Sequence, residues 1–75
     1  MEKVIVYTSN TCTYCVAVKN YLREHNIEFE ERNVGKTQYR KELISLGFMS
    51  VPVLKIGDEI IKGFDISAIN NCLGL

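Results

Sequence analysis

Two cysteines, Cys12 and Cys15, lie three positions apart where an apolar run, Val4–Tyr7, gives way to a segment with helical periodicity. Residues at this spacing share one face of a helix and lie within disulfide reach of each other. The N-terminus of a helix offers unpaired backbone N–H groups and the positive end of the peptide dipoles, and both lower the pKa of a nearby thiol. We therefore expect a thiolate at Cys12 and a reversible dithiol/disulfide centre.

Size and charge exclude several classes of protein. The 75 residues suffice for one domain, and 47% hydrophobic with 24% charged residues is typical of a globular protein. Nine basic and nine acidic side chains cancel, so the basic excess that nucleic-acid binding needs is missing. No apolar run approaches the ~18 residues of a membrane span. We expect a single domain over residues 1–75, monomeric, that binds neither nucleic acid nor membrane.

The chain has three cysteines, an odd number that does not suit the disulfide framework of a small secreted scaffold. The first residues also lack the apolar stretch of a secretory signal. A close cysteine pair without such a framework is typical of a reducing compartment, where it is catalytic or metal-binding. We therefore expect a cytoplasmic protein. The third cysteine, Cys72, is expected to pack as a small apolar residue.

Periodicity and turn signals predict the element order β-α-β-α-β-β-α. Strands are expected at Val4–Tyr7, Ile27–Asn33, Pro52–Ile56 and Glu59–Lys62, and helices at Thr13–His25, Thr37–Leu46 and Ile66–Leu73. Gly57-Asp58 marks a two-residue hairpin, and Asp65 is a suitable helix N-cap. The first β-α-β unit should be a parallel crossover and the hairpin must be antiparallel. A solvated face is expected for the charged residues Glu28, Glu30, Glu31 and Arg32.

This layout resembles the thioredoxin fold, and three motifs resemble the glutaredoxin family in particular. The segment Tyr7-Thr-Ser-Asn-Thr-Cys-Thr-Tyr-Cys15 is similar to the family's Tyr-Thr-x-x-x-Cys-x-Tyr-Cys. Ser50-Val51-Pro52 is similar to its Thr-Val-Pro loop, and Gly63-Phe64-Asp65 to the end of its Gly-Gly-x-Asp signature. The resemblance covers nearly the whole chain. It implies an α/β, thioredoxin-like fold in which a mixed four-stranded sheet is packed with three helices.

The resemblance also implies a thiol-disulfide oxidoreductase with no tightly bound cofactor. Cys12 would be the nucleophile that attacks a substrate disulfide, and Cys15 would resolve the mixed disulfide by displacing the reduced product. Disulfide-containing or glutathionylated proteins would be the substrates. Glutathione is the favoured co-substrate and electron donor.

Seven further residues are implied to bind the substrate or glutathione: Thr13, Tyr14, Val51, Pro52, Gly63, Phe64 and Asp65. A cis bond before Pro52 would leave the backbone of Val51 able to pair with an extended substrate. The N–H groups of Phe64 and Asp65 would hold a carboxylate. Two plainer interpretations stay open, namely a half-exposed aromatic at Tyr14 and a simple N-cap at Asp65.

Several positions differ from those of glutathione-using members. Where many glutaredoxins have a lysine, a proline, a glycine and an aspartate, this chain has Ser9, Thr13, Lys62 and Ile66. Leu46–Pro52 and Gly63-Phe64 are similar to redoxins that are glutaredoxin-like in sequence but are reduced by thioredoxin reductase. Thioredoxin reductase is therefore the alternative electron donor.

A different class of function is a metal-binding or glutathione-ligated iron–sulfur module. Two thiolates are half of a zinc site, and the remaining candidates, His25 and Cys72, lie far along the chain, so we expect no metal site. Some glutaredoxins without proline after the first cysteine share an iron–sulfur cluster between two chains. Thr13 leaves that alternative open, because thiolates are the usual ligands of such clusters.

Overall fold

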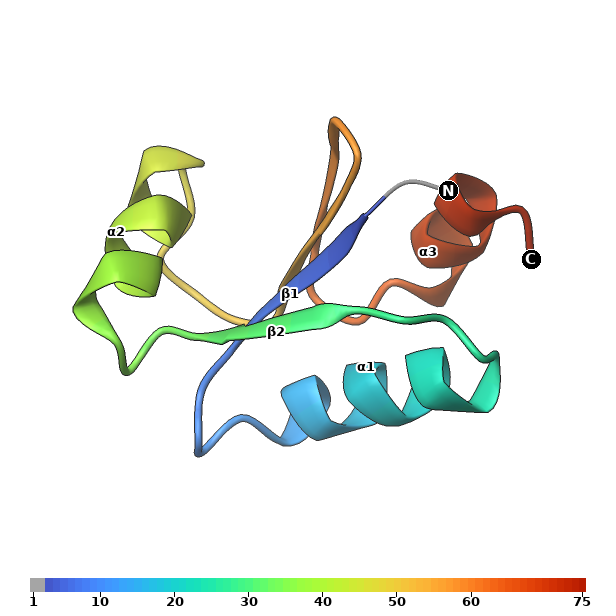
Figure 1. Cartoon of the computed structure of the whole chain (residues 1–75), viewed down its shortest axis with the longest axis horizontal. Coiled ribbons are helices and arrows are strands. Elements are labelled where there is room, and N and C mark those ends of the chain that lie inside the picture. The colour runs from blue at the N-terminus through green and yellow to red at the C-terminus, as the bar shows by residue number, and fades with distance from the viewer. Residues whose placement is uncertain (1–2) are drawn as a thin grey trace.

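A computed structural model of the chain describes residues 3–75. The seven elements follow the predicted order β-α-β-α-β-β-α (Figure 1). The strands are β1 (Val4–Thr8), β2 (Glu30–Asn33), β3 (Val53–Ile56) and β4 (Glu59–Lys62). The helices are α1 (Thr13–Glu24), α2 (Thr37–Ser45) and α3 (Ile66–Leu73).

The four strands form one mixed sheet in the order β2-β1-β3-β4. Strands β1 and β2 are parallel, whereas β1 pairs with β3, and β3 with β4, in antiparallel fashion. The mixed four-stranded sheet with three helices is thus confirmed. All five residues of β1 are buried, as expected for an apolar strand covered on both faces.

The helices cover both faces of the sheet, and Figure 1 shows α2 on one side with α1 and α3 on the other. The larger core lies under α1 and α3 and consists of Val4, Val6, Val18, Leu22, Leu54, Ile56, Ile61 and Ile69. The smaller core lies under α2 and consists of Ile5, Tyr7, Leu43 and Val53. Cys72 is partly buried against the larger core, which confirms its expected packing. Within residues 3–75, no helix combines the length and hydropathy needed to cross a membrane.

The start of β2 differs from the prediction, which placed it at Ile27. The Ile27 N–H donates to the Leu22 carbonyl at 2.9 Å and thereby closes the end of α1. Asn26 adopts φ 58°, in the left-handed region that a chain often uses to leave a helix. The Ile27 and Phe29 side chains still pack against the larger core, so their apolar character reflects packing rather than strand pairing.

The core under α1 generates a stability prediction. Leu22 is 0% exposed, so Leu22→Ala should lower the free energy of unfolding by about 2–5 kcal/mol, through lost burial and the cavity left behind. Val16→Ala is the matched control on the same helix, because Val16 is 53% exposed. Urea unfolding followed by circular dichroism measures both. Equal losses in the two variants would contradict the placement of this core.

Candidate active site

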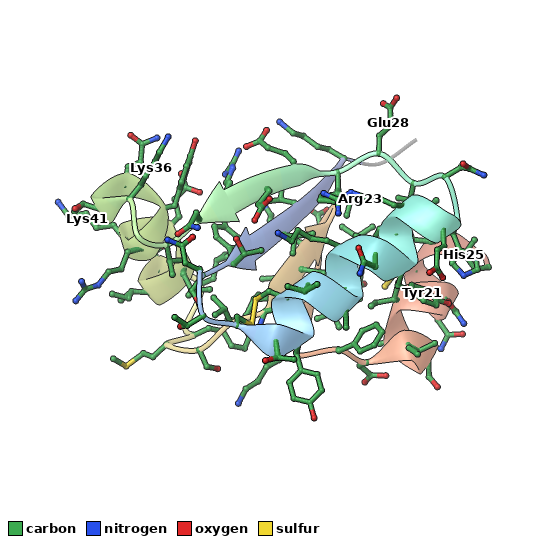
Figure 2. The ribbon with its side chains drawn as sticks, turned by 90° about the horizontal axis from the view of Figure 1, so that it is seen from below. Tyr21, Arg23, His25, Glu28, Lys36 and Lys41 are labelled. Atoms are coloured by element: carbon green, nitrogen blue, oxygen red, sulfur yellow. A yellow bond between two sulfur atoms is a disulfide. The ribbon has the colours of Figure 1, made fainter. Side chains whose placement is uncertain are left out.

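The first turn of α1 carries both cysteines of the predicted pair. Cys12 is the N-cap of α1, and Cys15 lies inside the helix. They are joined by a disulfide with their Cα atoms 5.2 Å apart, drawn as a yellow bond beside the start of α1 in Figure 2. The Cys15 N–H donates to Cys12 Sγ at 3.0 Å. Cys15 is 1% exposed, whereas Cys12 is half-buried, so the first cysteine is the accessible one.

The register of the sheet brings the three sequence motifs to one end of the molecule. Tyr7 on β1 lies opposite Val53 on β3, and Val53 lies opposite Lys62 on β4. The loop with Cys12 follows β1, Pro52 directly precedes β3, and Gly63 directly follows β4. Motifs that are far apart in the sequence therefore leave or enter the sheet at the same edge.

Backbone hydrogen bonds hold these loops together. The Gly63 N–H donates to the Pro52 carbonyl at 2.8 Å. The Val34 N–H, just after β2, donates to the Thr8 carbonyl at 2.8 Å and anchors the start of the loop that carries the cysteines. The peptide bond before Pro52 is cis, as the family resemblance implied. Gly63 has φ 76°, a conformation that favours glycine because a Cβ is disfavoured there.

The remaining predicted residues differ in their surroundings. Thr13 and Tyr14 lie between the cysteines, and Tyr14 is 67% exposed, more than the half-exposed aromatic considered for it. Phe64 is half-buried and meets the Tyr21 ring edge-on at 5.9 Å between centroids. The Asp65 carboxylate accepts a hydrogen bond from the Ala68 N–H at 3.1 Å and is the N-cap of α3. Asp65 is therefore an N-cap, as its position predicted.

Comparisons with known proteins agree with this arrangement. The family model described as glutaredoxin matches residues 4–61. This chain belongs to the glutaredoxin family. As a glutaredoxin with a Cys12–Cys15 pair, it is a thiol-disulfide oxidoreductase.

Three similar proteins illustrate the range within the family. Glutaredoxin-like protein NrdH of Lactococcus lactis is 37% identical over 62 residues, covering 81% of this chain and 86% of that protein. A glutaredoxin of Pseudomonas aeruginosa is 34% identical over 67 residues, covering 87% and 80%. The solved structure of NrdH-redoxin from Escherichia coli matches with a TM-score of 0.85 and 31% identity, covering 92% of each chain. The fold of this glutaredoxin is thus thioredoxin-like, as predicted.

The charged residues of β2 were predicted to form a solvated face, but they form hydrogen bonds that connect β2 to other elements of this glutaredoxin. Glu31 accepts hydrogen bonds from Thr8 Oγ1 at 2.8 Å and from Lys19 Nζ at 2.9 Å. Thr8 is 0% exposed, at the end of β1, and Lys19 lies on α1. Both hydrogen bonds lower the pKa of Glu31, and the bond from Lys19 has the larger effect. Glu31 therefore ties the cysteine-bearing helix to the end of the central strand.

A second set of charges lies on the opposite face of β2. Arg32, only 20% exposed, forms ion pairs with Glu30 and, at 2.6 Å, with Glu42 of α2. Tyr7 Oη donates to the same Glu42 oxygen at 2.9 Å. The pKa of Tyr7 is raised, mainly by burial and secondly by this hydrogen bond. The expectation of a solvated Arg32 is wrong. Alternation along β2 is the signal that separates the residues facing α2 from Glu31, which faces α1.

No metal site accompanies the dithiol in the described part of the chain. Among residues 3–75, no three His, Cys, Asp or Glu side chains are grouped closely enough to hold a metal ion.

The lowered pKa of Glu31 predicts a pH-dependent contribution to stability. A carboxylate with a folded-state pKa below its ordinary 4.5 stabilises the fold above about pH 4.5, and this contribution is lost as the pH falls through the folded-state pKa. We expect Glu31→Gln to lower the melting temperature at pH 7, with a gap from wild type that shrinks toward pH 3. Glu59→Gln, an exposed carboxylate on β4, is the control. A gap of constant size from pH 7 to pH 3 would refute this role.

Proposed function

We propose that this glutaredoxin reduces protein disulfides through Cys12 and Cys15 and receives its electrons from an NADPH-dependent thioredoxin reductase. The observation that carries the proposal is the accessible Cys12 at the N-terminus of α1, bonded to the buried Cys15 at the edge where Pro52 and Gly63 meet. Substrate contacts are assigned to Thr13, Tyr14, Val51, Pro52, Gly63, Phe64 and, through its backbone N–H rather than its carboxylate, Asp65. The odd cysteine count supports a cytoplasmic location.

The reaction begins with both cysteines reduced. The Cys12 thiolate attacks one sulfur of the partner disulfide, a mixed disulfide forms, and the partner's other sulfur leaves as a thiolate. Cys15 then loses its proton and attacks Cys12 Sγ, which releases the second partner thiol and leaves the Cys12–Cys15 disulfide. Two electrons from NADPH, delivered by the reductase with two protons, restore the dithiol.

The surroundings of Cys12 support its role as the attacking group. The Cys15 N–H already donates to Cys12 Sγ, and a hydrogen bond to the charged form of a group favours that form. The N-terminus of a 12-residue helix adds its dipole in the same sense. Cys15 is shielded from solvent and bonded to Cys12, which suits a resolving thiol.

The sequence motifs alone favour glutathione as the electron donor. Three observations favour thioredoxin reductase instead. The Asp65 carboxylate, the group that could pair with the ammonium of glutathione, already accepts a hydrogen bond as the cap of α3. Ser9 replaces the lysine with which many glutaredoxins bind the glycyl carboxylate. The similar NrdH-redoxin from Escherichia coli is described as having a thioredoxin-like activity profile. Glutathione remains the alternative donor.

Removal of each thiol separates the two chemical steps. Cys12→Ser should abolish reduction of a protein disulfide, because no nucleophile remains at the accessible position. Cys15→Ser should also stop turnover but should trap the partner as a mixed disulfide on Cys12, visible as an added mass on a non-reducing gel or by mass spectrometry. Protein-disulfide turnover by Cys12→Ser would show that the nucleophile is assigned wrongly.

The donor is tested by two coupled assays that follow NADPH oxidation at 340 nm. One contains thioredoxin reductase, and the other contains glutathione with glutathione reductase. We expect turnover with thioredoxin reductase, and we expect Asp65→Asn to leave that turnover unchanged, since asparagine retains the cap and removes only the charge. Asp58→Asn, in the hairpin turn, is the matched control.

Turnover confined to the glutathione assay would contradict the proposed donor. A rise in the KM for glutathione in Asp65→Asn but not in Asp58→Asn would then assign Asp65 to glutathione binding. Absence of NADPH oxidation in both assays would refute reduction by either donor.

A further inference from the structure

A cavity of about 260 Å³ opens on the α2 side of the molecule, next to the loop that precedes Pro52. Its lining residues come from α2 and from the chain on either side of that helix: Val34, Arg40, Leu43, Ile44, Met49, Ser50 and Val51. Apolar groups dominate this lining, and two of them are well exposed, Ile44 at 50% and Met49 at 90%. Methionine adapts its shape to different apolar partners, which suits a binding surface. We name this cavity the α2 groove.

The α2 groove is continuous with the active-site edge of the sheet. Val51 lines the groove and directly precedes the cis Pro52, whose carbonyl is bonded to Gly63. Val34, at the other side of the groove, is bonded through its N–H to Thr8 at the start of the cysteine loop. A substrate chain that pairs with the backbone of Val51 therefore lies beside the α2 groove.

The charge around the α2 groove is positive. Among the described residues that line it, Arg40 is the charged one, whereas Lys36, the N-cap of α2, and Lys41, on α2, lie outside the lining (Figure 2). Across the described residues 3–75, none of these three cations forms an ion pair with a carboxylate. The one acidic residue of α2, Glu42, is bonded to Arg32 and Tyr7. The groove therefore combines an apolar floor with the guanidinium of Arg40, and its complement is an apolar side chain together with a carboxylate.

We propose that the α2 groove is a specificity site for protein substrates, occupied by an extended acidic segment that carries the attacked cysteine. This inference rests on the disulfide reductase function proposed above. Side chains of an extended chain alternate between its two faces, so an apolar residue two positions from the cysteine shares the face of the cysteine. That residue enters the groove, and an Asp or Glu two positions further along the segment, on the same face, meets Arg40. A small disulfide reaches Cys12 without using the groove.

Two disulfide-bonded peptides test the proposal with the thioredoxin reductase assay, or the glutathione assay if that is the active one. In the first peptide, leucines stand two residues from the cysteine and glutamates stand four residues from it, on each side, so that all share one face of the extended chain. In the second, lysines replace the glutamates. Bis(2-hydroxyethyl) disulfide is the small substrate that reports the dithiol chemistry alone.

We expect Arg40→Glu to raise the KM for the acidic peptide about 3- to 10-fold and to lower the KM for the lysine peptide, because an attraction becomes a repulsion. Lys41→Glu, the same charge change on the same helix but outside the lining, should have a smaller effect on either peptide. Ile44→Ser should raise the KM for both peptides, whereas Ile60→Ser, at a 37% exposed position on β4, should not. All four variants should reduce the small disulfide at the wild-type rate.

The other possible outcomes distinguish failure of the groove assignment from failure of the reductase function. Equal KM values for the two peptides in wild type and Arg40→Glu would overturn the groove assignment, while turnover of the small disulfide would leave the proposed reductase function intact. A dimer in sedimentation velocity that Ile44→Ser dissociates would show that a second copy of the chain covers the groove, and would also overturn it. Failure of wild type with every disulfide would instead refute the reductase function itself.

Discussion

The in-register pairing of β1, β3 and β4 is the constraint on which the candidate site depends. Tyr7, Val53 and Lys62 lie side by side across the three strands. The loop with Cys12 after β1, Pro52 before β3 and Gly63 after β4 therefore lie at one edge of the sheet. A slip of one residue would turn every buried side chain of a strand toward the opposite face. Burial of β1 on both faces resists such a slip, and the same apolar packing that stabilises the fold therefore aligns the reactive loops.

The charged strand β2 connects the helices to this edge from both faces of the sheet. Glu31 reaches Lys19 on α1, whereas Arg32 reaches Glu42 on α2. An exposed ion pair contributes little to stability by itself. In both pairs, however, the glutamate also accepts a hydrogen bond from an almost fully buried residue of β1: Glu31 from Thr8, and Glu42 from Tyr7. The two networks thus fix the helix that carries the cysteines and the helix that borders the α2 groove to the same central strand.

Local signals in the sequence were sufficient for most of the fold. The cysteine spacing, the Gly57-Asp58 turn and the cap at Asp65 act over a few residues, and the structure has a disulfide, a hairpin and a capped helix at these positions. The start of β2 was missed because Ile27 and Phe29 are apolar for packing against a core formed by distant residues. Arg32 was misjudged for the same reason, since its partner Glu42 comes from another element.

The α2 groove could not be predicted either, because its walls come from separate segments around α2 that only the folded chain brings together. Reactivity of the dithiol depends on backbone geometry, on a helix N-terminus and on N–H donors, which many sequences supply equally well. Partner choice depends on side chains such as Arg40 and Ile44, which line the groove but lie outside the cysteine motif. Substitutions there alter which disulfide is presented to Cys12 without altering the chemistry that reduces it.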